Sequence, residues 1–405
     1  MTRCTSDTTL PNPLPAARLV ADVGGTNARF AWQAGSGQPL TDVRVLACAD
    51  YPTLQAAMRA YLQGLGRDAP LHAAIAIANP VTGDQVSMTN HHWSFSQTAV
   101  QSEFGFATLR VLNDFTALAL ALPALPADEL RQVGGTLARP HAPKALIGAG
   151  TGLGVSGLVP DGRGGWLPLQ GEGGHVTLPA STPRERLVMD GLTRLYGHAS
   201  AERAVCGHGL LDTYTLLCQA DGVAQPRCTT PAEVTDAALA ASDAHAVEAL
   251  NMFCAFLGSV AGNLALTLGA HGGVFIGGGI VPRLGAWFDA SPFRARFEAK
   301  GRFTAYLQAM PVWVITSAQS PALLGAARAS EVMDYEMTSA GHGYTSELKN
   351  AVGGESIVGV AGTLGMTLGS NSAIPVSRTA ISAKNKWWLM TTTSAPSASR
   401  RAALT

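Results

Sequence analysis

The sequence lacks an excess of charge of either sign. Lysine plus arginine number 28, and aspartate plus glutamate also number 28, among 405 residues. Nucleic acids and anionic membranes attract basic proteins, so we expect neither as a partner. Hydrophobic residues make up 47% of the chain and charged residues 14%, which is enough for two buried cores. The composition favours a folded enzyme that acts on neutral metabolites and nucleotides.

Paired cysteines are also missing. The six cysteines are scattered, and none forms a Cys-x-x-Cys pair. This pattern indicates neither a zinc knuckle nor a thioredoxin-type site. Single thiols suit a reducing compartment, and the first fifteen residues contain no apolar segment of the kind found in signal peptides. The sequence therefore predicts a cytoplasmic protein.

Two common nucleotide-binding signatures are absent. The chain contains no Gly-Lys pair, so it has no Walker A loop. The glycine-rich segment at 148–154 does not have the spacing of a dinucleotide-binding fingerprint. A nucleotide would have to be bound by another kind of glycine turn.

Charge is absent over one long stretch, between Glu248 and Arg283. Its length would allow a membrane-spanning helix. Asn251, Asn263 and His271 interrupt it, however, and pairs and triplets of glycine break its second half. The pattern favours a buried helix at about 246–269, followed by a buried strand at 274–276.

Two glycine turns of similar design stand out among the features that are present. The segments 19–30 and 145–155 each consist of an apolar run, a turn of glycine and threonine, and a second apolar run. This pattern predicts two β-hairpins whose tips expose backbone N–H groups to phosphate oxygens. The repetition suggests a duplicated fold that holds a polyphosphate from both sides.

Asp22 ends the first apolar run, directly before Gly24, Gly25, Thr26 and Asn27. A carboxylate beside a phosphate-binding turn can hold Mg²⁺ through water, because Mg²⁺ keeps much of its hydration shell. The alternative is an ordinary hairpin with a capping aspartate. The second turn, over Gly148–Gly154, favours the phosphate site, and the hydroxyl of Thr151 could add a donor.

Asp114 follows a predicted strand at 109–112 and precedes a predicted helix at 116–122. Phosphoryl transfer to an alcohol requires a group that accepts the proton of the hydroxyl, and a carboxylate can do this. The structural alternative is that Asp114 caps the helix that follows. The residue by itself does not decide between these roles.

A third group of polar residues lies at 171–175, where Glu172 and His175 flank two glycines. Both side chains could reach one polar ligand, a pattern that suits a sugar. Metal binding is the alternative, although no third ligand lies nearby. Glu202 adds a carboxylate, or it is a solvated helix residue.

Two further segments have both a functional and a structural interpretation. His91, His92 and Trp93 could line the same cleft, or Trp93 could pack beneath its loop. The glycines of 272–279 could let an adenine lie against the backbone, or they could serve tight turns.

Alternating strands and helices on both sides of residues 123–143 predict an α/β protein with doubly wound sheets. Together the motifs resemble those of the hexokinase-type bacterial glucokinases of the actin-like ATPase superfamily. The matching segments are 21–29, 88–96, 113–116, 148–154, 169–175, 200–203 and 272–283. The resemblance implies two actin-like (ribonuclease H-like) αβ domains that flank a ligand cleft.

The resemblance also implies a role for each matching residue. Asp114 becomes the catalytic base for the 6-hydroxyl of glucose. The sugar ligands become Asn113, Glu172, His175 and Glu202. The residues that bind ATP become Asp22, Gly24, Gly25, Thr26, Asn27, Gly148, Gly150, Thr151, Gly152, Gly277 and Gly278. Mg²⁺ would be held by Asp22 through water, and the family usually works as a homodimer.

The resemblance divides the chain into four segments. We expect a flexible extension at 1–17, a small domain at 18–135 completed by a helix within about 318–330, a large domain at 136–317, and an unmatched tail at 331–405. The expected activity is ATP-dependent phosphorylation of glucose to glucose 6-phosphate. The alternatives are a kinase of the same fold for another sugar or phosphoryl donor, and a non-catalytic sugar sensor.

Overall fold

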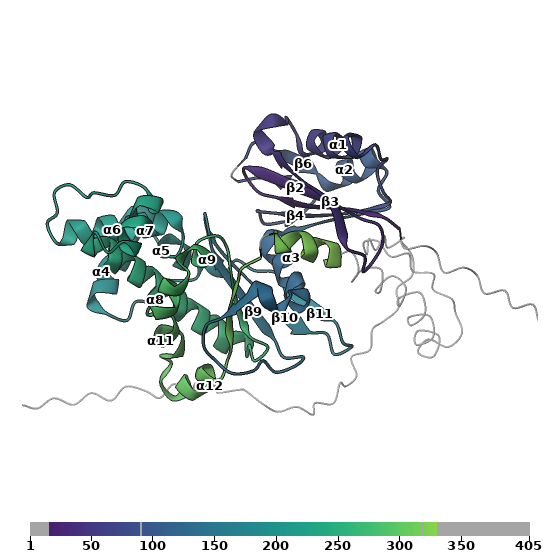
Figure 1. Cartoon of the computed structure of the whole chain (residues 1–405). Coiled ribbons are helices and arrows are strands. Elements are labelled where there is room, and N and C mark those ends of the chain that lie inside the picture. Colours follow the sequence, from purple (N-terminus) through teal and green to yellow (C-terminus); the bar gives the residue numbers. More distant parts are fainter. Residues whose placement is uncertain (1–15, 90, 318, 330–405) are drawn as a thin grey trace, which may run out of the picture. The chain divides into compact units, whose positions relative to one another are not determined.

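The computed structural model describes residues 16–89, 91–317 and 319–329 (Figure 1). The predicted tail at 331–405 and nearly all of the predicted extension at 1–17 lie outside these residues. Contacts divide the chain into the units Met1–Thr345 and Ser346–Thr405, and every described residue belongs to the first unit. Within it the fold is α/β, as predicted.

The first sheet has the strand order β3-β2-β1-β4-β7. The β1–β2 and β2–β3 pairs are antiparallel, and the β1–β4 and β4–β7 pairs are parallel. The strand bounds are Arg18–Val23 for β1, Asn27–Gln33 for β2, Leu40–Ala47 for β3, His72–Ile77 for β4 and Thr108–Asn113 for β7. The predicted hairpin at 19–30 is therefore confirmed.

Helices cover both faces of this sheet. Alternation along β1 directs Leu19 and Val23 into one core with α1 (Leu54–Leu65) and α2 (Gln97–Phe104). It directs Val20 into a second core with α3 (Asp114–Ala121) and the helix at 321–329. The same core also contains Leu146 and Phe275 of the second sheet, so the assignment of the last helix to the small domain remains a prediction. A short hairpin, β5 (Gln85–Ser87) and β6 (Ser94–Ser96), leads into α2.

The second sheet repeats this arrangement with the strand order β11-β10-β9-β12-β13-β8. Its first three strands are antiparallel neighbours, and β9–β12 and β12–β13 are parallel pairs. The strand bounds are Leu130–Gln132 for β8, Lys144–Ala149 for β9, Leu153–Pro160 for β10, Trp166–Leu169 for β11, Val274–Gly277 for β12 and Val312–Ile315 for β13. The second predicted hairpin, and with it the duplicated design, is confirmed.

Strand β8 corrects one detail of the predicted organisation. We placed residues 130–132 in the small domain, but they pair with β13 at the edge of the second sheet. Three residues among prolines and glycines give no periodic pattern from which a strand can be predicted. The division into two domains otherwise remains a prediction.

The helices of the second half pack on one another and on the second sheet. Their bounds are Pro183–Tyr196 for α4, Ala201–Ala204 for α5, Gly207–Ala220 for α6, Pro231–Leu239 for α7, Ala244–Leu268 for α8, Val281–Leu284 for α9, Ala286–Ala290 for α10, Phe293–Glu298 for α11 and Thr304–Gln308 for α12. Short 3-10 turns lie at Cys48–Asp50, Leu122–Ala124, Ala127–Glu129, Gly173–His175 and Gly301–Phe303.

Helix α8 is the uncharged stretch that could be mistaken for a membrane span. It begins two residues before the predicted position and ends at Leu268. Its most apolar window has a mean hydropathy of 1.6 and is 78% buried within the protein. Because α6, α7 and α11 pack against it, α8 is the central helix of the second core.

The helix at 321–329 crosses α3 at very close range. A Cβ added to Gly325 would lie 1.6 Å from the carbonyl oxygen of Ala117. We predict that Gly325→Ala lowers the free energy of unfolding by about 1–3 kcal/mol, since overpacking against backbone outweighs helix propensity. Propensity alone would favour alanine by about 1 kcal/mol.

Gly64 supplies the matched control for this prediction, because it also lies in a helix. A Cβ at Gly64 would meet only the end of the flexible Arg44 side chain. Gly64→Ala should therefore leave the stability unchanged or raise it slightly in urea unfolding. Equal stability of Gly325→Ala and the parent protein would contradict the close helix crossing.

Candidate active site

The first glycine turn places a carboxylate and a guanidinium side by side. Gly24 N–H donates to the carbonyl oxygen of Asn27 across the turn, at 3.0 Å. The antiparallel register then puts Asp22 opposite Arg29, and Arg29 Nη1 lies 3.3 Å from Asp22 Oδ2. The Asp22 side chain is only 11% exposed. Its other oxygen, Oδ1, has no hydrogen-bond partner among the described residues and remains available to a ligand.

The second glycine turn is closed by its own backbone and covered by the loop after β12. Gly150 N–H donates to Gly152 O at 2.8 Å, and Ile280 N–H donates to Ala149 O at 3.3 Å. Gly278 has a positive φ of 79°, and a Cβ there would lie 2.3 Å from Ala149 O. The predicted second phosphate turn and the predicted adenosine segment are therefore neighbours in space.

Asp114 is the first residue of α3, and the helix is capped by its neighbour. The side-chain oxygen of Asn113 accepts from Phe115 N–H at 2.9 Å and from Thr116 N–H at 3.2 Å. The capping role that we considered for Asp114 therefore belongs to Asn113. Its amide group also donates to Asp114 Oδ1 at 3.0 Å, so Asn113 orients the carboxylate.

The surroundings of Asp114 change its acidity. Its pKa is raised to about 6, chiefly because burial disfavours the charged carboxylate; the hydrogen bond from Phe115 N–H lowers the pKa, and the nearby negative charge of Asp22 contributes to the rise. Oδ1 accepts from Phe115 N–H at 2.9 Å, and Oδ2 has no partner among the described residues. Asp114 thus presents one free carboxylate oxygen with a proton affinity suited to neutral pH.

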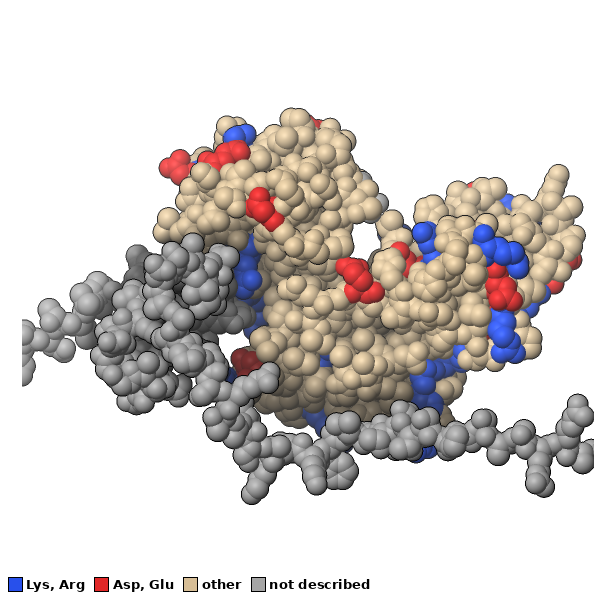
Figure 2. Space-filling view, turned by 180° about the vertical axis from the view of Figure 1, so that it is seen from behind, with Lys and Arg blue, Asp and Glu red and all other residues tan. Residues whose placement is uncertain are grey.

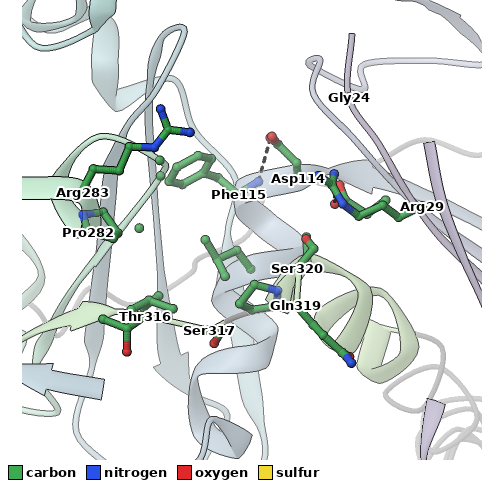
Figure 3. A pocket seen from close by; sticks show the side chains of 18 residues that line it. Gly24, Arg29, Asp114, Phe115, Pro282, Arg283, Thr316, Ser317, Gln319 and Ser320 are labelled. Carbon is green, nitrogen blue, oxygen red and sulfur yellow. Dashed lines mark hydrogen bonds and ion pairs between the residues drawn. The ribbon is translucent and has the colours of Figure 1, made fainter. Parts of the chain in front are cut away.

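A cavity of about 690 Å³ unites these elements (Figure 3). The residues that line it come from the first hairpin (Asp22, Gly24, Arg29), from α3 (Asp114, Phe115, Leu118), from the stretch between the end of β12 and α9 (Gly277, Gly278, Gly279, Pro282, Arg283) and from the stretch between the end of β13 and the helix at 321–329 (Ile315, Thr316, Ser317, Gln319, Ser320, Pro321, Ala322). It therefore joins four segments that are far apart in the sequence.

Several predicted phosphate-site residues do not line this cavity. Gly25, Thr26 and Asn27 form the outer part of the first turn, with Thr26 exposed. The second turn, Gly148–Gly152, lies behind Phe115 and Gly278, which do line it. The structure therefore brings Asp22, Gly24, Asp114, Gly277 and Gly278 to one space and sets the second turn next to it.

Two arginines of the cavity were missed in the sequence. Arg29 could have been found by pairing the two arms of the predicted hairpin, since that register sets it opposite Asp22. Arg283 lies six residues after Gly277 and ends the matching segment 272–283, but no role was assigned to it. Its guanidinium has no hydrogen-bond or ion-pair partner among the described residues, whereas Arg29 is paired with Asp22.

None of the four predicted sugar ligands lines this cavity. Asn113 caps α3 beside it, and the other three lie on other segments. His175 Nε2 and Glu202 Oε1 are 4.0 Å apart, and their side chains are 60% and 27% exposed. Glu172 is exposed and precedes the short 3-10 turn that carries His175. Glu202 lies in the first turn of α5, and its Oε2 accepts from Leu153 N–H at 2.9 Å. Glu202 is therefore attached to the strand that leaves the second turn.

The segment around Trp93 has the structural role that we considered for it. Trp93 is 2% exposed, and its indole N–H donates to the carbonyl oxygen of Tyr51 at 3.0 Å. The ring of His91 packs edge-on against it, and His92 Nε2 lies 3.2 Å from Pro52 O. None of these three residues lines the cavity, and Asn90 lies outside the described residues.

The cavity fits Mg²⁺ bound mainly by water and phosphate. Among the described residues no cluster of three or more His, Cys, Asp or Glu side chains could hold a metal ion. Mg²⁺ at phosphate sites commonly uses one or two carboxylates, waters and the phosphates themselves. The unpartnered Oδ1 of Asp22 satisfies that smaller requirement.

On the surface, acidic and basic side chains are mixed over the described part of one face (Figure 2).

Sequence relatives identify the family. The profile of the Glucokinase family matches residues 19–333. The chain is 55% identical over 320 residues to the glucokinase of Chromobacterium violaceum, which covers 79% of this chain and 90% of that protein. It is 53% identical over 309 residues to the bifunctional protein glk of Burkholderia pseudomallei, covering 76% of this chain but 47% of that protein.

Solved structures extend the comparison to the fold. The crystal structure of a glucokinase from an Antarctic psychrotroph has a TM-score of 0.70 and 34% identity, covering 77% of this chain and 98% of that one. A glucokinase from Balamuthia mandrillaris in complex with glucose has a TM-score of 0.64 at 21% identity, with coverages of 77% and 92%, and shows the shared fold. This chain therefore belongs to the glucokinase family, whose profile matches it from Leu19 through both sheets.

Proposed function

We propose that this protein transfers the γ-phosphoryl group of ATP to the 6-hydroxyl of glucose, giving glucose 6-phosphate and ADP. The observation that carries the proposal is Asp114, a half-buried carboxylate with a free oxygen in the cavity shared by the first glycine turn and Gly277–Gly279. Membership of the glucokinase family supports the choice of substrate. Turnover followed through ADP release, with a panel of sugars and phosphoryl donors, tests it directly.

ATP is proposed to lie between the two glycine turns. The backbone N–H groups at the tips of the two turns, Gly24–Asn27 and Gly148–Gly152, would face phosphate oxygens, except those of Gly24 and Gly150, which are bonded within their own turns. The hydroxyl of Thr151 would be a further donor. The adenosine would lie near Gly277 and Gly278. Arg283 supports this placement, because it is a cation in the cavity without a partner among the described residues.

Mg²⁺ is proposed to bind near Asp22 through water. When bound, the ion neutralises charge on the phosphates and helps to align them. Arg29 holds Asp22 Oδ2, so the carboxylate is fixed with Oδ1 free. The protein thus contributes a single oriented carboxylate rather than a full metal cage.

Glucose is proposed to bind through Asn113, Glu172, His175 and Glu202. A site that pairs several hydroxyls rejects analogues that lack one, because buried partners are then left unsatisfied. Closure around the sugar would exclude water and bring the 6-hydroxyl to Asp114 Oδ2. That oxygen accepts the hydroxyl proton as the new O–P bond forms and the bond from the γ-phosphorus to the β,γ-bridging oxygen breaks.

The family resemblance further supports a cytoplasmic homodimer as the working form. Equal numbers of basic and acidic residues, 28 of each, support small molecules rather than nucleic acid or a membrane as partners. Sedimentation of the full chain would measure the oligomeric state.

Replacement of the proposed base gives the first test of this mechanism. Asp114→Ala and Asp114→Asn should each lower kcat at least about 100-fold, because general-base help is worth about 10²- to 10⁴-fold. ATP affinity, measured by calorimetry, should stay nearly unchanged. Asp68→Asn, at an exposed carboxylate without a hydrogen-bond partner among the described residues, is the control. Retention of a tenth of the parent turnover would refute the assignment.

The raised pKa of Asp114 gives a second prediction. The base must be ionised, and its pKa is about 6 rather than the usual 3.8. The ratio kcat/KM should therefore be level above neutral pH and fall about tenfold per unit below pH 6. A pH–rate profile checks this, and the residual activity of Asp114→Asn should lack that acid limb. A profile that stays level down to pH 4.5 would contradict it.

Arg283 gives a third prediction. Arg283→Gln should raise the KM for ATP about tenfold, as expected for loss of one charge-assisted contact of about 1.4 kcal/mol. The KM for glucose should change little, because the proposed sugar ligands lie on other elements. Arg194→Gln, at an exposed arginine without a partner among the described residues, is the matched control. Equal effects on both KM values would remove Arg283 from the nucleotide site.

A further inference from the structure

Leu153 is the first residue of β10, directly after the second glycine turn, and both predicted sugar-binding segments contact its backbone. Its N–H donates to Glu202 Oε2 at 2.9 Å. On the other side, a Cβ added to Gly174 would lie 2.1 Å from Leu153 O, so the segment that carries His175 packs directly on this peptide. The end of the phosphate turn is therefore held between the two sugar-binding segments.

The two oxygens of Glu202 face different parts of the proposed site. Oε2 is bonded to Leu153 N–H, and Oε1 lies 4.0 Å from His175 Nε2. The side chain is 27% exposed, so Oε1 can still reach a ligand. One carboxylate thus connects the backbone of the phosphate turn with the place where the sugar is proposed to bind.

A second hydrogen bond joins the phosphate turn to the start of α6, the helix that follows α5. Gly207 N–H, at the start of α6, donates to Gly150 O at 3.0 Å, and Gly150 N–H donates to Gly152 O within the turn. The contact at Gly152 is so close that a Cβ there would lie 2.5 Å from Glu202 Oε2. The conformation of the turn and the position of the Glu202 carboxylate are therefore mutually dependent.

We propose that Glu202 couples the two substrate sites: a sugar held at Oε1 fixes the second phosphate turn through the Oε2–Leu153 bond, so that glucose tightens the binding of ATP. This inference rests on the function proposed above. A turn of glycines loses much conformational freedom when it binds phosphate. If the sugar has already ordered the turn, the nucleotide binds with a smaller entropic cost, and the coupling is reciprocal.

Calorimetry with a non-hydrolysable ATP analogue tests the coupling. In the parent protein, saturating glucose should lower the Kd of the analogue at least about fivefold, within the usual range of coupling between sites. The analogue should lower the Kd of glucose by the same factor. Failure of either ligand to change the affinity of the other, in a protein that turns over glucose and ATP, would overturn the coupling and leave the proposed function intact.

Gly152→Ala is the sharpest variant, because it displaces the Glu202 carboxylate without removing it. Its coupling factor, the Kd of the analogue without glucose divided by the Kd with saturating glucose, should fall below about twofold, whatever the change in the affinity of each ligand alone. Gly83→Ala, where a Cβ would meet nothing within 4 Å, should keep the parent factor. Full coupling in Gly152→Ala would overturn the inference, whereas absence of glucose turnover in the parent protein would sink the proposed function itself.

Hydrogen exchange on the parent protein provides a measurement that does not depend on any variant. Glucose alone, without nucleotide, should slow exchange of the Leu153 amide and of the peptide over 148–154 at least about tenfold, since the Oε2 bond must break before that amide exchanges. Unchanged exchange in this segment at saturating glucose would overturn the coupling.

Discussion

The contact of Phe115 with the second hairpin is the constraint on which the site depends. Built Cβ atoms at Gly154 and Gly148 would lie 2.1 Å and 2.8 Å from the Phe115 ring. Glycine at both positions therefore lets the ring reach the hairpin backbone. Because Phe115 follows Asp114 directly, this contact sets the distance between the proposed base and the second turn. At this position burial raises the pKa of the Asp114 carboxyl group to about 6.

The duplicated sheets explain why such a contact is available. Each sheet places a glycine hairpin beside parallel strands, and α3 leaves the first sheet at the end of β7 to pack against β10 and β11 of the second. The helix at 321–329 returns to α3 and closes the same core. Because these helices contact both sheets, the cavity is lined by residues that follow strands of the first sheet and by residues that follow strands of the second.

Much of the fold and part of the site could be predicted from the sequence. Both hairpins, the helix now seen as α8, and Asp114 at the end of β7 were found, because each depends on local periodicity or turn chemistry. Strand β8 was not predicted, and Arg283 was assigned no role. Their positions depend on long-range pairing that leaves no mark in the neighbouring residues.

The sequence by itself determined the glycine turns, the apolar runs that form the strands on either side of them, and the order of the motifs that indicates the family. Only the tertiary structure decided which polar groups share a space. It gave the helix cap to Asn113, left one oxygen of Asp114 free, and attached Glu202 to Leu153. The physical reason is that local patterns fix backbone conformation, whereas desolvation and hydrogen-bond partners depend on segments far apart in the chain.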